Sequence, residues 1–448
     1  MAEAHRRLAV TNAEVAPTLA GPMGSHTGSY WLAILALAVL AVVGLVALIG
    51  MVAAGPEPRA RWGYVVGVMV FLFSTLQAAP VLAFMTRLAK GFWGIPLRRA
   101  AELGVVASLV TTPLFIIVLK QLPDWQGRRS IWFDWPGAPH LWDGIAVVIF
   151  ALLGLALLYL TSLPDFASRR DVGGSAVARA LSLGWTGTVR QWQVLSGGIV
   201  VLGAFYLIML VFMHVLIAAD FALSQVPGWN SAVFAPYQGV SSLQAAIATT
   251  LLLAAALRRF GGLERYIGLD AFWSAAKPML ALSLLFFYFT WSEFLIPWYG
   301  RKPEEQFVLE LLMFGPYLPL FILVFSLCFI LPFGLLIWNP IRVSINGPTF
   351  VAALILIGNF IDRMRIYVAA WSVSGPVDQH LEHPPPAYLP GGGEVLVVVG
   401  TLAAVGLLYM LALRVVPPIS IWEFKNGLLL KVEAPYLRRQ VAVIAKPR

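Results

Sequence analysis

Ionisable side chains inside long apolar stretches are the residues of this sequence whose types and spacing could do chemistry. His214 precedes Asp220 by six residues, and Glu293 and Asp362 each lie within a later apolar stretch. A charged side chain in hydrocarbon costs at least a few kcal/mol, so such residues are functional candidates by default. An imidazole near a carboxylate could relay protons or hydrogen-bond a quinol hydroxyl. Glu293 has no cation near it in sequence, so its carboxyl group could be neutral and accept a proton.

Each candidate also has an ordinary structural interpretation. His214 could be a packed side chain, Asp220 an interfacial cap, and Asp362 could pair with Arg363 or with a cation on another helix. Gln77 and Gln244 could simply hold helices together, as amides in membrane proteins often do. Spacing alone leaves both interpretations open. The candidates for a proton path or a quinol site are His214, Asp220, Glu293, Asn359, Asp362, Arg363 and Arg365.

Membrane-spanning helices must position these side chains. The chain has 448 residues, of which 59% are hydrophobic and 12% charged, whereas a soluble domain has about 45–50% and about 25%. Stretches long enough to cross about 30 Å of hydrocarbon recur along its length. Barrel strands alternate over only about ten residues, so these runs predict an all-α polytopic membrane protein with about ten helices. We expect them near residues 31–54, 63–88, 101–120, 142–163, 195–219, 240–258, 277–298, 311–337, 348–372 and 394–415.

The distribution of lysine and arginine predicts the orientation of these helices. If the N-terminus is cytoplasmic, 22 of the 31 cations fall on the cytoplasmic side, as the positive-inside rule requires. The sequence thus predicts a cytoplasmic tail over 1–29, a transmembrane domain over 30–415 and a basic cytoplasmic tail over 416–448. The net charge of +9 is then mostly this bias, and we expect no nucleic-acid partner.

Residues that could hold a metal or haem are scarce. There is one cysteine, Cys328, and of six histidines only His214 falls within a predicted helix. A cytochrome b needs paired axial histidines on facing helices, so this pattern argues against that class. We expect no cofactor bound by this chain, and any Fe–S or haem centre would belong to a partner subunit.

Two predicted outer loops differ from the rest of the chain. Segment 121–143 is rich in tryptophan and aspartate, and segment 373–393 combines acidic residues, histidines and a proline run. One interpretation is an aromatic belt with solvated loops. The other is a docking surface for an extracytoplasmic subunit, and both stay open. The residues are Asp124, Trp125, Trp132, Asp134, Trp135, Trp142 and Asp143 in the first loop, and Asp378, His380, Glu382, His383 and Pro384–Pro386 in the second.

Three segments resemble the NrfD/polysulfide reductase (PsrC-like) membrane-subunit family, and within it the membrane subunits ActF and ActC of alternative complex III. The first runs from His214 through Asp220-Phe-Ala to a Pro-Gly-Trp and a Pro-Tyr pair, which contain Trp229, Pro236 and Tyr237. The second surrounds Glu293 and ends at Trp298-Tyr-Gly, and the third is Asn359-x-x-Asp362-Arg363. The C-terminal Pro-Pro-Ile-Ser-Ile-Trp422-Glu423 adds to the likeness. The segment Trp93-x-x-Pro96-x-Arg98-Arg99-x-x-Glu102 is similar to ActF.

This resemblance implies ten helices arranged as two four-helix bundles plus flanking helices. It also implies an extracytoplasmic Fe–S subunit, a second NrfD-like membrane subunit and c-type cytochrome subunits as partners, with lipid and quinone around them. The polar residues listed above would be ligands of menaquinol or another quinol, or members of a proton path. The similarity to ActF favours proton conduction or scaffolding.

The sequence therefore predicts an inner-membrane, multi-pass subunit of a quinol-linked respiratory or photosynthetic electron-transfer complex. It would support quinol oxidation, proton translocation or both beside the Fe–S subunit. The alternative is a secondary transporter whose path uses Glu293 and Asp362. Transporters often contain internal repeats, and no clear repeat is present in the sequence, so the transporter is the second choice.

Overall fold

The computed structural model describes residues 10–21, 28–123, 130–173, 176–373 and 384–429, together with the backbone of 431–436 and 439–444. These residues form helices, apart from the antiparallel strands β1 (Lys431–Tyr436) and β2 (Arg439–Ile444). The long helices are α3 (Gly28–Ala53), α8 (His140–Asp171), α10 (Val189–Phe221), α11 (Phe234–Phe260), α12 (Leu269–Gly300), α17 (Asn346–Ser372) and α18 (Gly392–Val415).

The shorter helices include the parts of three broken crossings. They are α4 (Ala60–Ser74), α5 (Ala79–Leu88), η1 (Phe92–Gly94), α6 (Ile95–Glu102), η2 (Leu103–Ala107), α7 (Ser108–Leu119), α14 (Leu318–Phe325), η5 (Ser326–Ile330) and α15 (Leu331–Leu336). The remaining ones are α2 (Asn12–Leu19), α9 (Ala176–Leu181), η3 (Leu223–Gln225), α13 (Pro303–Leu309), η4 (Glu310–Phe314), α16 (Asn339–Arg342) and α19 (Ile421–Leu429).

Nine helices among the described residues are long and apolar enough to cross a membrane, which confirms the helical membrane-protein class. Helix α17, predicted as the ninth crossing, is not one of the nine. The predicted start of the eighth crossing at residue 311 was wrong, because α14 begins at Leu318. Pro316 and Pro319 explain the break, since proline lacks the amide proton and disfavours a helical residue before it.

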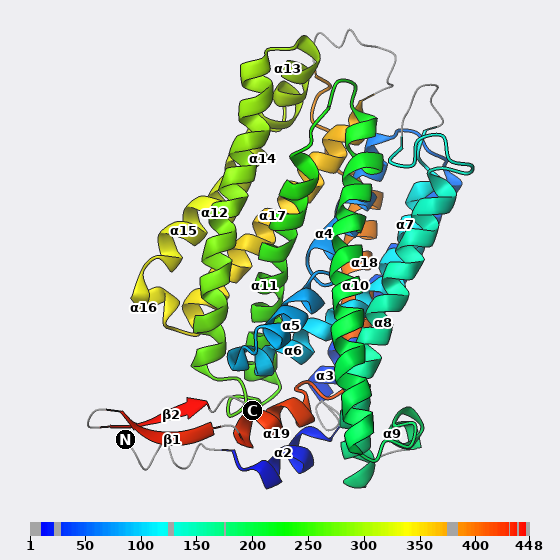
Figure 1. Ribbon diagram of the computed structural model, residues 1–448. Helices are drawn as coiled ribbons and strands as arrows, with labels where there is room; N and C mark the ends of the chain where they lie inside the picture. Colours follow the sequence, from blue (N-terminus) through cyan, green and yellow to red (C-terminus); the bar gives the residue numbers. More distant parts are fainter. Residues whose placement is uncertain are drawn as a thin grey trace.

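The helices run between two ends of a long bundle (Figure 1). Helices α2 and α19 pack against each other at one end, and α13 lies at the opposite end. The segment from residue 416, predicted only as a basic tail, thus contains a helix that packs on the bundle. Helix α17 crosses the bundle obliquely and packs along α4.

Close helix contacts depend on glycine. A Cβ atom at Gly63 of α4 would lie 2.6 Å from the Val368 Cα atom of α17. Helices α3 and α18 meet in the same way at Gly44 and Gly400. Small residues allow such backbone approach in membranes, where packing rather than hydrophobic burial drives association. The contact at Gly63 fixes the height and rotation of α17, which carries most of the candidate site.

The exterior of the bundle is apolar. Leu32 and Val46 on α3 are 67% and 64% exposed, and Phe205 on α10 is 55% exposed. The buried interior instead includes several charged side chains, among them Arg99, Asp362 and Arg363. An apolar exterior over a partly charged interior is what a lipid solvent produces.

The two outer loops are described only in part. Residues 124–129 and 374–383 lie outside the described part of the chain, so the predictions on Asp124, Trp125, Asp378, His380, Glu382 and His383 have no structural outcome. Trp132, Trp135 and Trp142 pack together with ring centroids 5.1–5.7 Å apart. Trp132 also donates a 2.6 Å hydrogen bond to Asp143.

Candidate functional site

The buried charges of α17 form one group with α11. The Tyr237 hydroxyl donates a 2.7 Å hydrogen bond to one Asp362 oxygen, and Arg365 donates a 2.8 Å bond to the other. Arg363 lies 3.4 Å from the first oxygen. Asp362, Arg363 and Arg365 are at most 4% exposed. Two guanidinium groups therefore share one carboxylate in the interior, which leaves the α17 group with a surplus positive charge.

Neighbouring helices hold both arginines in place. Arg363 donates to the hydroxyls of Ser74 on α4, at 3.2 Å, and of Ser241 on α11. Arg365 donates to the Leu312 carbonyl and lies over the Phe321 ring, 5.4 Å from its centroid. The η4 turn supplies that carbonyl, because a π-helical turn leaves some carbonyl groups without an ordinary helical partner.

Glu293 on α12 faces the loop between η3 and α11. The Trp229 indole donates a 3.1 Å hydrogen bond to one carboxyl oxygen, and the Ser231 hydroxyl donates a 2.5 Å bond to the other. No salt bridge to Glu293 occurs among the described residues. Neutral donors thus take the place of a cation, as the sequence indicated for this residue.

A small cavity joins Glu293 to the α17 group. It has a volume of about 20 Å³ and is lined by Glu293, Thr290, Tyr237 and Arg365, among others. A second cavity of about 20 Å³ lies on the other side of Glu293, next to Ser231 and Glu305. Each exceeds the roughly 10–15 Å³ that one water molecule requires. The structure therefore brings Glu293 close to the α17 group across this cavity.

His214 and Asp220 lie outside this pair of cavities. His214 Nδ1 donates a 2.8 Å hydrogen bond to the Leu210 carbonyl. The buried Nε2 atom has no hydrogen-bond partner among the described residues. Asp220 instead accepts a 3.2 Å bond from the Ile131 amide at the base of the tryptophan loop. His214 therefore lines neither cavity, while Asp220 ties the end of α10 to the backbone at Ile131.

The other predicted residues have mixed positions. Asn359 is 2% exposed, and its side-chain oxygen accepts no hydrogen bond from a described residue. Pro236 lies in the first turn of α11, and Trp298 is 47% exposed at the end of α12. Tyr237 and Trp229, which the sequence offered only as motif support, are direct partners of the two carboxylates. These contacts could not be predicted from residue spacing, because the two partners lie on different elements that are far apart in the sequence.

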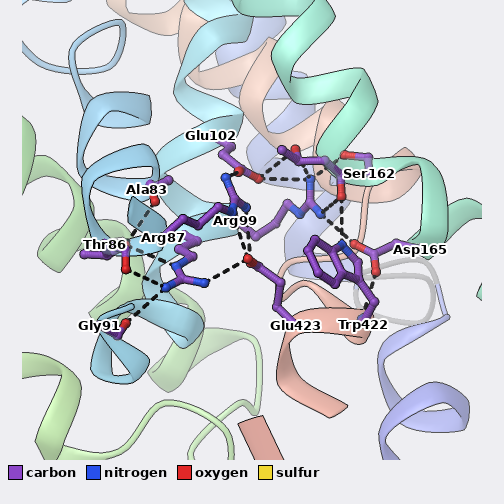
Figure 2. A network of polar contacts seen from close by, with 12 residues as sticks. Ala83, Thr86, Arg87, Gly91, Arg99, Glu102, Ser162, Asp165, Trp422 and Glu423 are labelled. Atoms are coloured by element: carbon purple, nitrogen blue, oxygen red, sulfur yellow. Dashed lines mark hydrogen bonds and ion pairs between the residues drawn. The ribbon is translucent and has the colours of Figure 1, made fainter. Parts of the chain in front are cut away.

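A second buried cluster lies at the α19 end (Figure 2), and the sequence offered Arg98, Arg99, Glu102 and Glu423 of it only as parts of motifs. Arg99 on α6 pairs with Asp165 on α8 at 2.6 Å and with Glu102 at 3.1 Å. Thr161 donates a 3.0 Å hydrogen bond to Glu102. Arg99 and Asp165 are fully buried. Asp165 was not among the predicted residues, because it follows Pro164 close to Arg169 and Arg170 and looks like part of an ordinary interfacial helix end.

Glu423 of α19 completes this cluster. Arg87 and Arg98 each approach it to 2.8 Å, and Arg87 also contacts Glu102. Burial alone would raise the pKa of the Glu423 carboxyl, but Arg87 and Arg98 outweigh burial and lower that pKa to about 2. The backbone amides of Ile421 and Trp422 donate to Asp165. Three arginines and three carboxylates thus anchor α19 to α5, α6 and α8.

Neither a family model nor a curated protein matches the chain. Among the described residues, no group of three or more histidine, cysteine, aspartate or glutamate side chains is placed to hold a metal ion. The site brings together two carboxyl groups, a tyrosine hydroxyl and water-sized cavities, which together suit proton transfer.

Proposed function

We propose that the chain is the proton-conducting membrane subunit of a quinol-linked electron-transfer complex of the alternative complex III kind. The observation that carries the proposal is the cavity shared by Glu293, Tyr237 and Arg365, with Asp362 bonded directly to the last two. The resemblance of these same segments to the NrfD family supports the link to quinol and to an Fe–S partner.

The proposed path passes from Glu293 to Asp362. A water molecule in the shared cavity would take a proton from the Glu293 carboxyl group. The Tyr237 hydroxyl, which lines the cavity, would pass it toward Asp362. Arg363 and Arg365 would hold the Asp362 carboxyl group in position between transfers.

The proposal includes α17 as a tenth crossing. Helices α2 and α19 lie together at one end of the bundle, and a chain whose two ends lie on one side must cross an even number of times. Nine crossings, without α17, would put α2 and α19 on opposite sides of the membrane. The excess of lysine and arginine on the predicted inner side supports cytoplasmic termini, and the protein would lie in the inner membrane.

The partners belong to the opposite end. The packed Trp132, Trp135 and Trp142 would lie at the outer interface, where an Fe–S subunit and c-type cytochromes would dock. Quinol and a second NrfD-like subunit would lie beside the helices. The redox centres would belong to these partners, and this chain would supply the proton path.

Cavity size separates this proposal from a solute transporter. The two cavities at Glu293 measure about 20 Å³ each, whereas pockets for small molecules have roughly 300–1,000 Å³. They fit a water molecule and exclude an organic solute. Proton transfer therefore agrees better with the site than a solute path through Glu293 and Asp362 does.

The test uses the complex as the host membrane assembles it. The tagged chain is purified in mild detergent, reconstituted in liposomes and supplied with quinol, and the protons moved per electron are measured. We expect Fe–S and haem subunits to co-purify, and Glu293→Gln and Asp362→Asn to lower the proton ratio while assembly persists. Asp270→Asn, exposed at the start of α12, is the matched control.

Two results would contradict the proposal. An unchanged proton ratio in both variants would make Glu293 and Asp362 packing residues. A polypeptide that purifies alone and moves a solute into liposomes would favour the transporter.

A further inference from the structure

A large cavity at the α19 end plays no part in the proposed proton path. It has a volume of about 720 Å³ and lies between α5, the η1–α6 segment, α10 and α19. Most of its wall is apolar. The apolar side chains are Phe84, Leu88, Phe92, Ile95, Ile199, Val200 and Leu429. This volume is of the size that binds an extended organic ligand.

The cavity opens on the apolar exterior of the bundle. Leu88 and Val200, on opposite walls, are 59% and 52% exposed. Val200 continues the exposed face of α10 that includes Val201 and Phe205. A ligand that enters from this side comes from the bilayer, and its apolar part would lie against these two walls.

The polar end of the cavity carries one surplus positive charge. Arg87, Arg98 and Glu423 line it, and they belong to the neutral cluster of three arginines and three carboxylates. Lys90 also lines the cavity, is exposed, and forms no ion pair with a described residue. Each nitrogen of the Arg87 and Arg98 guanidinium groups already donates to Glu423, Glu102, Thr86 or Gly91. Lys90, which has no such contact among the described residues, is therefore the cation best placed to bind an anion.

We propose that this cavity binds one phospholipid with a single net negative charge, its phosphate at Lys90 and an acyl chain between α5 and α10. Basic pockets between transmembrane helices on the cytoplasmic side typically recognise anionic headgroups. The apolar walls and the lipid-facing opening favour a bilayer lipid over free phosphate. The inference goes beyond the proposed function, since the cavity lies at the opposite end from Glu293.

The test measures the lipid that stays on the protein. The complex is transferred to nanodiscs of mixed phosphatidylglycerol and phosphatidylcholine, extracted in mild detergent, and its retained lipids are counted by native mass spectrometry. We expect about one phosphatidylglycerol per chain in this cavity. Lys90→Gln should lower its retention roughly fivefold, the ratio that corresponds to about 1 kcal/mol for one basic residue near an anionic surface.

A second variant tests the volume rather than the charge. Ser196→Phe places an aromatic ring into the cavity from an exposed position of α10, and it should displace the lipid with every ion pair intact. Two control variants change residues outside the cavity. Val201, replaced in Val201→Phe, lies on the same helix but does not line the cavity. Lys302, replaced in Lys302→Gln, is a cation at the opposite end of the bundle and is 70% exposed. Both controls should retain lipid like the wild type.

Three outcomes would overturn the proposal. If both Lys90→Gln and Ser196→Phe retained as much phosphatidylglycerol as the wild type, this cavity would not be the binding site. Equal retention of phosphatidylcholine would remove the role of charge. Displacement of the lipid by excess inorganic phosphate would make the free anion the ligand. None of these outcomes bears on the proton ratio, so the two proposals fail separately.

Discussion

The two buried charge clusters differ in how completely their charges are paired. At the α19 end, Arg87, Arg98 and Arg99 face three carboxylates, and each carboxylate contacts at least one arginine. At the α17 site, two arginines share Asp362, while Glu293 has only neutral donors and a water-sized cavity on each side. Complete pairing makes a rigid anchor, because any change leaves a buried charge alone. Incomplete pairing beside a water-sized cavity leaves carboxyl groups, such as that of Glu293, that can exchange a proton.

The largest expected effect comes from removing one arginine from each cluster. Arg99→Met leaves Asp165 with backbone amides alone, so we expect the free energy of unfolding to fall by about 3–5 kcal/mol, as for a broken buried ion pair. Arg365→Met leaves Asp362 with Arg363 and Tyr237, and the loss should be about 1.5 kcal/mol. Denaturant titration in detergent micelles measures both values. Equal losses would mean that the clusters do not differ in pairing.

The pH dependence of stability sharpens the same comparison. An unfolded glutamate has a pKa of about 4.3, and the folded pKa of Glu423 is lowered to about 2. The ionised form is therefore favoured by folding, so this stability is complete above about pH 4.3 and is lost as the pH falls toward about 2. The contribution of ionised Glu423 to the free energy of unfolding is about 3 kcal/mol, at 1.36 kcal/mol per pKa unit.

Glu423→Gln should remove that contribution. The variant should unfold more easily than the wild type at pH 7, and the difference should shrink as the pH falls below about 4.3. Thermal unfolding from pH 7 to pH 3 measures this. A difference that stays constant over this range would show that Glu423 is not held ionised by Arg87 and Arg98.

The sequence predicted the α17 site better than the α19 cluster for a physical reason. Asp362 and Glu293 interrupt apolar stretches, and an ionisable residue in hydrocarbon is visible without knowledge of its partners. Asp165 and Glu423 lie at or beyond the ends of predicted helices, where charged residues are ordinary. Their importance comes from partners far away in sequence, such as Arg99 for Asp165 and Arg87 for Glu423.

The helix boundaries show the same limit. Apolar run length predicted helices over most crossings, yet the run from residue 311 contains a π-helical turn and a break at Gly315. That break supplies the Leu312 carbonyl for Arg365. Pro316 and Pro319 lie at this break, and packing against α17 shows what the interruption is for.

The smallest expected effect separates packing from proton transfer within the α17 site. Tyr237 donates its hydroxyl proton to Asp362, whereas Tyr367 exchanges hydrogen bonds with the Gln238 amide group. Tyr237→Phe and Tyr367→Phe each remove one buried hydroxyl, so each should lower the free energy of unfolding by about 1 kcal/mol. Only Tyr237→Phe should lower the protons moved per electron in the reconstituted complex, because only that hydroxyl lies between the shared cavity and Asp362. A similar fall in the proton ratio in both variants would attribute the effect to loosened packing between α11 and α17. The α17 site would then have no demonstrated role in proton exchange, and it would no longer differ in function from the anchor at the α19 end.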